Sequence, residues 1–191
     1  MRAIVLVFCI LIMVLSCAPY KPARIKLNGG ETIDVTGKAD DGYFVYKTPN
    51  SNSQKVHASD IDYLEMKNNR NEISKFKYLK VASKNKYLLM EEEIEGPVSL
   101  YIITSEFYGD PFAAGMSRLQ STIVNHYVRK EQNGEVVFLS SNHFANDNLA
   151  KIGPFFFKDC PELVNKIKTE EFTKKQIEEI VNYYNQNCFV N

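Results

Sequence analysis

The chain has 191 residues, and its 23 Lys and Arg balance its 23 Asp and Glu, so the formal net charge is zero. An apolar fraction of 45% at zero net charge argues against intrinsic disorder. The missing basic excess argues against nucleic acid as the main partner, because phosphate neutralisation dominates that affinity. The length allows one domain, or a small domain with an appendage.

Residues 1–16 have the pattern of an export signal peptide. Arg2 supplies a positive charge, and an apolar stretch of thirteen residues follows from Ala3 to Leu15. A membrane-spanning helix needs about 20 apolar residues, so this stretch is too short and is typical of a signal-peptide core. The segment Val14-Leu15-Ser16-Cys17 resembles the bacterial lipobox. The resemblance implies cleavage before Cys17 and a diacylglycerol on its thiol.

Two alternatives stay open for this segment: an ordinary signal peptide with an incidental cysteine, and an uncleaved anchor. Residues 17–23, which contain Pro19 and Pro22, predict a short tether. Some Gram-negative lipoproteins carry an acidic surface-export signal after the cysteine, but Ala18-Pro19-Tyr20-Lys21 contains no acid. We therefore expect the periplasmic face of the outer membrane. The expected partners are the membrane, through the lipid, and an envelope protein or polymer.

Residues 24–66 predict a meander of five short strands. Turn signals at Asn28-Gly29-Gly30 and Asp40-Asp41-Gly42 separate the first three, because these residues tolerate positive φ. The strand and turn order, ending in the step Ser59-Asp60-Ile61, resembles the small SH3-like barrels of short bacterial lipoproteins. The resemblance implies a small barrel, and a fold by itself assigns no function.

A polar break at 67–72 is a possible boundary, and residues 73–140 predict further antiparallel strands. The dipeptide Asn133-Gly134 between two β-rich runs indicates a hairpin near the end of this region. The segment from Gly109 to Arg118 is expected to be a loop. Its apolar residues Phe112 and Met116 make it the best candidate for an exposed contact loop.

Residues 144–188 predict a helical region and, within it, a helical hairpin. A first helix is expected over 144–158, interrupted or offset by Gly153-Pro154, and Pro161 suits the first position of the next. Thr173 and Gln176 form a capping box in sequence. The apolar residues of the last helix recur at helical spacing on one face: Ile177, Ile180, Val181, Tyr184 and Cys188.

Cys160 precedes one predicted helix and Cys188 ends the next, so two antiparallel helices would bring the cysteines together. In an oxidising compartment this predicts a disulfide, and two buried free thiols are the alternative. The segments Asp159-Cys160-Pro161-Glu162-Leu163 and Ile180–Asn185 resemble the C-terminal part of uncharacterised exported proteins of Bacteroidetes-type bacteria. The resemblance implies lineage and location and carries no activity.

Candidate chemical residues are sparse. The run Glu91-Glu92-Glu93 with Glu95 is expected to be a solvated face or strand edge, with a cation site as the alternative. His57, His126 and His143 lack metal-ligand spacing, so no metal and no cofactor is expected. No catalytic or nucleotide-binding motif occurs in the sequence.

The fold class that follows is α+β, with a mainly antiparallel β body and a C-terminal helical hairpin. The expected function is a non-catalytic binding or structural module, lipid-anchored in the cell envelope. The alternatives are a binder of a small apolar ligand within the β body and an enzyme without a recognisable motif.

Overall fold

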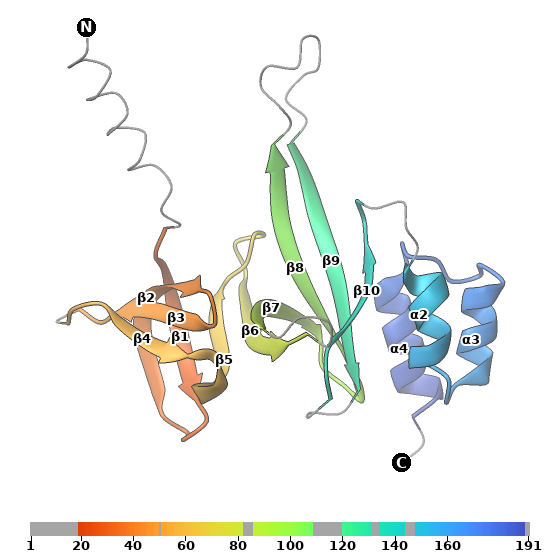
Figure 1. The fold of residues 1–191 in the computed structure, drawn as a ribbon, viewed down its shortest axis with the longest axis horizontal. Coiled ribbons are helices and arrows are strands. Elements are labelled where there is room, and N and C mark those ends of the chain that lie inside the picture. The colour runs from red at the N-terminus through yellow and green to blue at the C-terminus, as the bar shows by residue number, and fades with distance from the viewer. Residues whose placement is uncertain are drawn as a thin grey trace, which may run out of the picture.

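The computed structural model describes residues 19–49, 51–81, 86–108, 120–130, 134–143 and 148–189. Within these ranges the chain forms ten strands, one short 3-10 turn and three helices (Figure 1). The elements are β1 (Lys21–Leu27), β2 (Thr32–Asp40), β3 (Tyr43–Lys47), β4 (Gln54–His57), η1 (Ala58–Asp60), β5 (Ile61–Lys67), β6 (Ile73–Lys80), β7 (Tyr87–Ile94), β8 (Val98–Tyr108), β9 (Gln120–Lys130), β10 (Val137–Ser141), α2 (Asn148–Phe156), α3 (Pro161–Lys168) and α4 (Ile177–Asn187).

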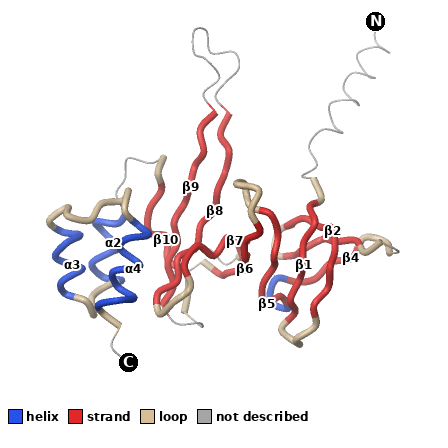
Figure 2. Tube along the Cα trace, turned by 180° about the vertical axis from the view of Figure 1, so that it is seen from behind, coloured by secondary structure: helices blue, strands red, loops and turns tan. Residues whose placement is uncertain are grey.

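All ten strands belong to one sheet, in the order β10-β9-β8-β7-β6-β5-β1-β2-β3-β4, and neighbours in this sheet run antiparallel. The helices gather at the C-terminal end of the molecule (Figure 2). The predicted α+β class with a mainly antiparallel β body is therefore confirmed. The sheet also continues through the predicted break at 67–72, where β5 and β6 form a hairpin.

The N-terminal part of the sheet follows the predicted meander. β1 pairs with β2 on one side and with β5 on the other, and η1 leads into β5. The positive φ of Gly30 (87°) and Gly42 (74°) falls in the two predicted turns. The strands enclose one apolar cluster, whose buried members are Ala23, Ile25, Val35, Phe44, Ala58, Ile61, Leu64 and Tyr78.

β1 begins at Lys21, three residues before the predicted start at Arg24, so part of the predicted tether belongs to the sheet. Pro22 is tolerated because it lies near the strand's start. It pairs with Thr36 of β2, whereas the pairing with β5 begins only at Ala23. A proline without an N–H is acceptable at such an end. The proline pattern therefore placed the start of the strand too late.

The C-terminal half of the sheet curls, so that the end of β6 meets the start of β10. A parallel bridge joins Val81 to Val136, and the Val136 N–H donates to the Lys80 carbonyl at 3.4 Å. The curl buries one apolar cluster made of Leu79, Val81, Met90, Tyr101, Tyr127 and Val136.

β8 and β9 form the longest hairpin, paired from Val98 with Lys130 to Tyr108 with Gln120. β7 reaches β8 only as far as Ile102, so the outer part of the hairpin extends beyond the sheet (Figures 1 and 2). In both views it projects to the same side as the start of β1. The predicted contact residues Phe112 and Met116 lie outside the described residues.

The helices cover the end of the sheet formed by β8, β9 and β10. Their apolar faces meet strand residues in one cluster, whose buried members are Val98, Leu100, Val128, Leu139, Leu149, Phe157, Cys160, Leu163, Ile167, Ile177, Ile180, Val181 and Tyr184. Four of the five residues of the predicted α4 face are buried there, and Cys188 packs against the same cluster. The amphipathic pattern of the tail therefore identified the buried face of this helix correctly.

Two details of the helices differ from the sequence prediction. α2 runs through Pro154 instead of breaking at Gly153. α4 begins at Ile177, because residues 174–175 form a turn, although the side chain of Gln176 still accepts from the Thr173 N–H at 3.2 Å. The hydrogen bond from the Thr173 N–H to the Gln176 side chain, one of the two bonds of the predicted capping box, thus forms in front of the helix instead of within its first turn.

Candidate functional site

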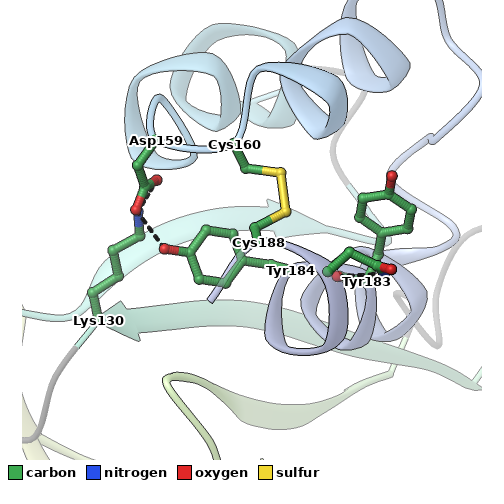
Figure 3. The surroundings of a disulfide bond; sticks show 7 residues. Lys130, Asp159, Cys160, Tyr183, Tyr184 and Cys188 are labelled. Carbon is green, nitrogen blue, oxygen red and sulfur yellow. Dashed lines mark hydrogen bonds and ion pairs between the residues drawn. A yellow bond between two sulfur atoms is a disulfide. The ribbon is translucent and has the colours of Figure 1, made fainter. Parts of the chain in front are cut away.

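The predicted cysteine pair, Cys160 and Cys188, is joined by a disulfide, with Cα atoms 5.4 Å apart (Figure 3). Cys160 stands directly before α3 and Cys188 directly after α4, as the helical pattern predicts. The bond therefore closes a unit of two helices, with a sequence separation of 28 residues. Cys160 is buried, so the bond adds to the apolar contact between helices and sheet.

A polar cluster beside the disulfide ties the helices to β9 (Figure 3). The Tyr184 hydroxyl and the Lys130 ammonium both donate to the carboxylate of Asp159, each at 2.5 Å. Lys130 Nζ also lies 4.7 Å from the ring centroid of Tyr184. Burial and the bond to Asp159 raise the pKa of Tyr184, while Lys130 and Tyr184 outweigh burial and lower the pKa of Asp159. The Tyr184 hydroxyl therefore stays protonated and the Asp159 carboxyl ionised near neutral pH, which suits a structural contact.

A second polar network crosses β6, β7, β8 and β9 around the carboxylate of Glu92. The Lys77 ammonium donates to Glu92 Oε1 at 2.8 Å, and Lys75 Nζ lies 3.1 Å from Oε2. The hydroxyl of Tyr101 donates to Glu92 Oε1 at 3.1 Å and accepts from Nη2 of Arg129 at 2.8 Å. The Arg129 guanidinium also stacks 5.3 Å from the centre of the Tyr101 ring.

The side chain of Glu92 is only 4% exposed, so the prediction of a solvated face or strand edge is wrong for this residue. Burial alone would raise the pKa of Glu92, but the bonds and charges of Lys77 and Lys75 outweigh it and lower the pKa. Glu91 is also buried and accepts from Asn68 at 2.7 Å, while Glu93 pairs with Arg70 at 2.9 Å.

The Glu92 network borders an open groove of about 810 Å³. The groove lies between the N-terminal meander and the curled half of the sheet, because residues of both line it. From the meander come Asn28, Ser59, Asp62 and Tyr63, and from the curled half come Lys75, Lys77, Lys80, Tyr87, Glu95, Arg129 and Glu135. Its walls therefore combine donors, acceptors and aromatic rings.

Arg129 stands out in this groove because its guanidinium is incompletely hydrogen-bonded. Its side chain has one hydrogen bond, to a neutral hydroxyl, and its buried Nε has no acceptor among the described residues. No carboxylate in the described part of the chain forms an ion pair with it. A buried donor without an acceptor is rare in native proteins and calls for an explanation.

Sequence reasoning missed this groove for a definable reason. The alternation Lys75-Phe76-Lys77 puts two lysines on one face of β6, and Glu92 lies on the same face of the sheet in β7. Only the register shows that they meet: Phe76 pairs with Glu91 and Lys77 with Met90. The alternation within each strand limits the register but does not select one pairing.

The remaining predicted positions lie apart. Cys17 falls outside the described residues, His57 caps η1 through its Nδ1, and His126 faces Ser140 Oγ at 3.3 Å. Within the described ranges no three His, Cys, Asp or Glu side chains are grouped to hold a metal ion. None of the helices in those ranges has the length and apolar content needed to cross a bilayer.

Comparisons of the chain with protein family models, with curated proteins and with solved structures give no match.

Proposed function

We propose that this protein is a lipid-anchored, non-catalytic binding module of the cell envelope, held by Cys17 at the periplasmic face of the outer membrane. The lipobox-like segment that ends at Cys17 supports the anchor. The disulfide between Cys160 and Cys188 supports export, because such bonds persist in oxidising compartments such as the periplasm. The lineage is that of the exported Bacteroidetes-type proteins that the C-terminal segment resembles.

The SH3-like character of the N-terminal part belongs to the same proposal. Three features support it: β1 pairs with both β2 and β5, the turn η1 carries the Ser59-Asp60 step, and β5 follows directly. A small scaffold of this kind offers its loops for binding without a catalytic centre of its own. Two of those loop positions, Asn28 and Ser59, line the groove.

The observation that carries the binding role is the groove beside Arg129. The Arg129 guanidinium has free N–H donors, and Lys75 and Lys77 place two further cations next to it. Lys75 and Lys77 are paired with Glu92 and the exposed Glu95. Lys80, Asp62 and Glu135 also line the groove, so its walls carry no net positive charge and the local attraction for an anion comes from Arg129. Arginine donors match the planar geometry of carboxylates and phosphates. The groove therefore suits an oxyanion on a segment of an envelope polymer.

Two other functions receive less support from the same residues. Acid–base catalysis needs a group that titrates near the working pH. The pKa of Glu92 is instead lowered and that of Tyr101 raised, so both are displaced away from neutrality. A small apolar ligand would need space inside the curled sheet, where buried side chains such as Met90, Tyr101 and Tyr127 already pack.

A polymer-binding experiment tests the proposal. The native protein is immobilised and exposed to polyglucuronate, to inorganic polyphosphate and to uncharged dextran, which separate carboxylate, phosphate and neutral polymers. We expect at least one anionic polymer to bind about tenfold more tightly than dextran, with an affinity that falls as salt rises. The variant Arg129→Gln should lose most of this preference, whereas Lys151→Gln on the exposed face of α2 should keep it.

Because Arg129 is half-buried, Lys75→Gln, at a side chain that is 33% exposed, serves as a second variant in case the first folds poorly. Equal binding of all three polymers, or an unchanged preference in correctly folded Arg129→Gln and Lys75→Gln, would contradict the proposed role of the groove.

A further inference from the structure

The start of β1 carries a group of lysines that the groove does not use. Lys21 is the first residue of β1 and pairs with Gly37, which places Lys38 beside that end of the strand. Lys47 pairs with Thr36, which itself faces Pro22. Lys67 follows Met66, the partner of Ala23. The pairing registers thus bring four lysines from four strands to one end of the sheet.

Tyr20 lies within this group. The ammonium of Lys38 is 5.5 Å from the centre of the Tyr20 ring, and that of Lys47 is 5.3 Å away on a neighbouring strand. Lys21, Lys47 and Lys67 are exposed, and Lys21 and Lys67 border the same small cavity of about 140 Å³. We call Tyr20, Lys21, Lys38, Lys47 and Lys67 the basic end surface.

The chain length between Cys17 and this surface limits its distance from a membrane. Four Cα–Cα steps lead from Cys17 to Lys21, and four extended residues span at most about 14 Å. If Cys17 carries the lipid, Lys21 must stay within about that distance of the headgroups, which is less than two Debye lengths of about 8 Å at physiological salt. The tether therefore lets the lysines approach the membrane surface to within one Debye length, where their charges act on it.

The composition of the surface fits such a contact. Lysine side chains extend their ammonium groups toward phosphates, and tyrosine rings favour the headgroup level of a bilayer. The two acids on β2 already have partners: Asp34 accepts from Arg24 at 2.8 Å, and Asp40 pairs with Lys55 at 3.5 Å. The groove, by contrast, is lined by Asn28, which follows the opposite end of β1.

We propose that the basic end surface docks on the anionic phosphate headgroups of the membrane that holds Cys17, which directs the groove away from the bilayer. The inference rests on the proposed anchoring at Cys17 for its distance limit, and on the register of β1, β2, β3 and β5 for its charge. Docking then gives a single orientation to a protein that would otherwise swing on a short tether.

Lysine acetylation read by mass spectrometry tests this docking on protein purified from its native membrane. The protein is placed on vesicles of pure phosphatidylcholine or of phosphatidylcholine mixed with phosphatidylglycerol. We expect labelling of Lys21, Lys47 and Lys67 to fall about fivefold or more on the anionic vesicles, and to recover at high salt. Lys151 and Lys158, which are exposed at the helical end, should be labelled equally on both.

A pair of variants provides the matched comparison. Lys38→Gln with Lys47→Gln should abolish the protection of Lys21 and Lys67 on anionic vesicles, whereas Lys151→Gln with Lys158→Gln should leave it intact. Equal labelling of the basic end surface on both kinds of vesicle would overturn the docking proposal.

The intact mass of the same sample separates this failure from failure of the anchor. If Cys17 carries no lipid, the proposed anchoring fails. The unanchored protein is then mixed with the same vesicles, and protection of the lysines from acetylation still decides whether the surface docks. Protection that does not depend on phosphatidylglycerol would also contradict it.

Discussion

Asn185 of α4 binds both backbone groups of Val98, the first residue of β8. Its side-chain oxygen accepts from the Val98 N–H at 2.8 Å, and its side-chain nitrogen donates to the Val98 carbonyl at 2.9 Å. The two residues are 87 positions apart, so this contact joins the last helix to the middle of the chain. A β-carbon at Gly96 would lie 2.7 Å from the Asn185 amide nitrogen, which explains the glycine before Pro97.

Replacing Asn185 therefore should loosen the helical end from the sheet. In Asn185→Ala both Val98 groups lose their partner, and we expect a loss of about 1 to 3 kcal/mol in the free energy of unfolding. Urea denaturation measures the loss. Asn187→Ala, which removes an exposed bond within α4, is the matched control and should cost less than about 0.5 kcal/mol. Equal losses in the two variants would show that the contact with Val98 contributes nothing.

Breaking the disulfide should destabilise the same end of the molecule. The bond closes a sequence separation of 28 residues, for which the chain-entropy model gives about 3 to 4 kcal/mol. We expect Cys160→Ser with Cys188→Ser to lower the free energy of unfolding by that order and to leave the N-terminal meander folded. Hydrogen exchange resolves the two parts. Faster exchange spread evenly over β1 to β5 and the helices would contradict a local role.

Glu92 should make stability depend on acid pH. Its pKa in the folded state lies below the unfolded value because Lys77 and Lys75 outweigh burial. The contribution is therefore fully present above about pH 4.3 and is lost as pH falls through the folded pKa. Glu92→Gln should cost about 1 to 3 kcal/mol at neutral pH and flatten the decline of stability below about pH 4.3. Urea titrations at several pH values measure both effects, and a decline of unchanged slope in Glu92→Gln would contradict them.

His126 should add a second pH dependence at a higher pH. Burial lowers its pKa, and the charge of Glu178 offsets this only in part. The folded state thus favours the neutral ring, so stability is present above about pH 6.5 and is lost as pH falls through the folded pKa. We expect His126→Gln to flatten the stability profile below about pH 6.5 while leaving the fall from Glu92 at lower pH in place. The same titrations separate the two windows, and an unchanged profile would exclude His126 as the cause.

Local patterns predicted the elements well because neighbouring residues determine them. The turns at Gly30 and Gly42 and the apolar face of α4 are local signals, and each is found where expected. The disulfide also followed from helical spacing, since two helix ends carried the cysteines.

The contacts that could not be predicted from the sequence depend on strand register and on the path of the chain. The contact of Glu92 with Lys75 depends on how β6 and β7 pair, and the bridge from Val81 to Val136 depends on the curl of the whole sheet. A run of glutamates ordinarily marks a solvated surface. Here Lys75 and Lys77 on the neighbouring strand make burial of Glu92 tolerable, and both are distant from Glu92 in the sequence.

The most direct test of the account is the intact mass of the protein purified from its native membrane, measured with and without reduction before alkylation. We predict a chain that begins at Cys17 and carries a diacylglycerol, and that gains two alkyl groups only after reduction. An unmodified chain that begins elsewhere would contradict the anchor. Two thiols alkylated without reduction would contradict the Cys160–Cys188 bond and, with it, the evidence for export.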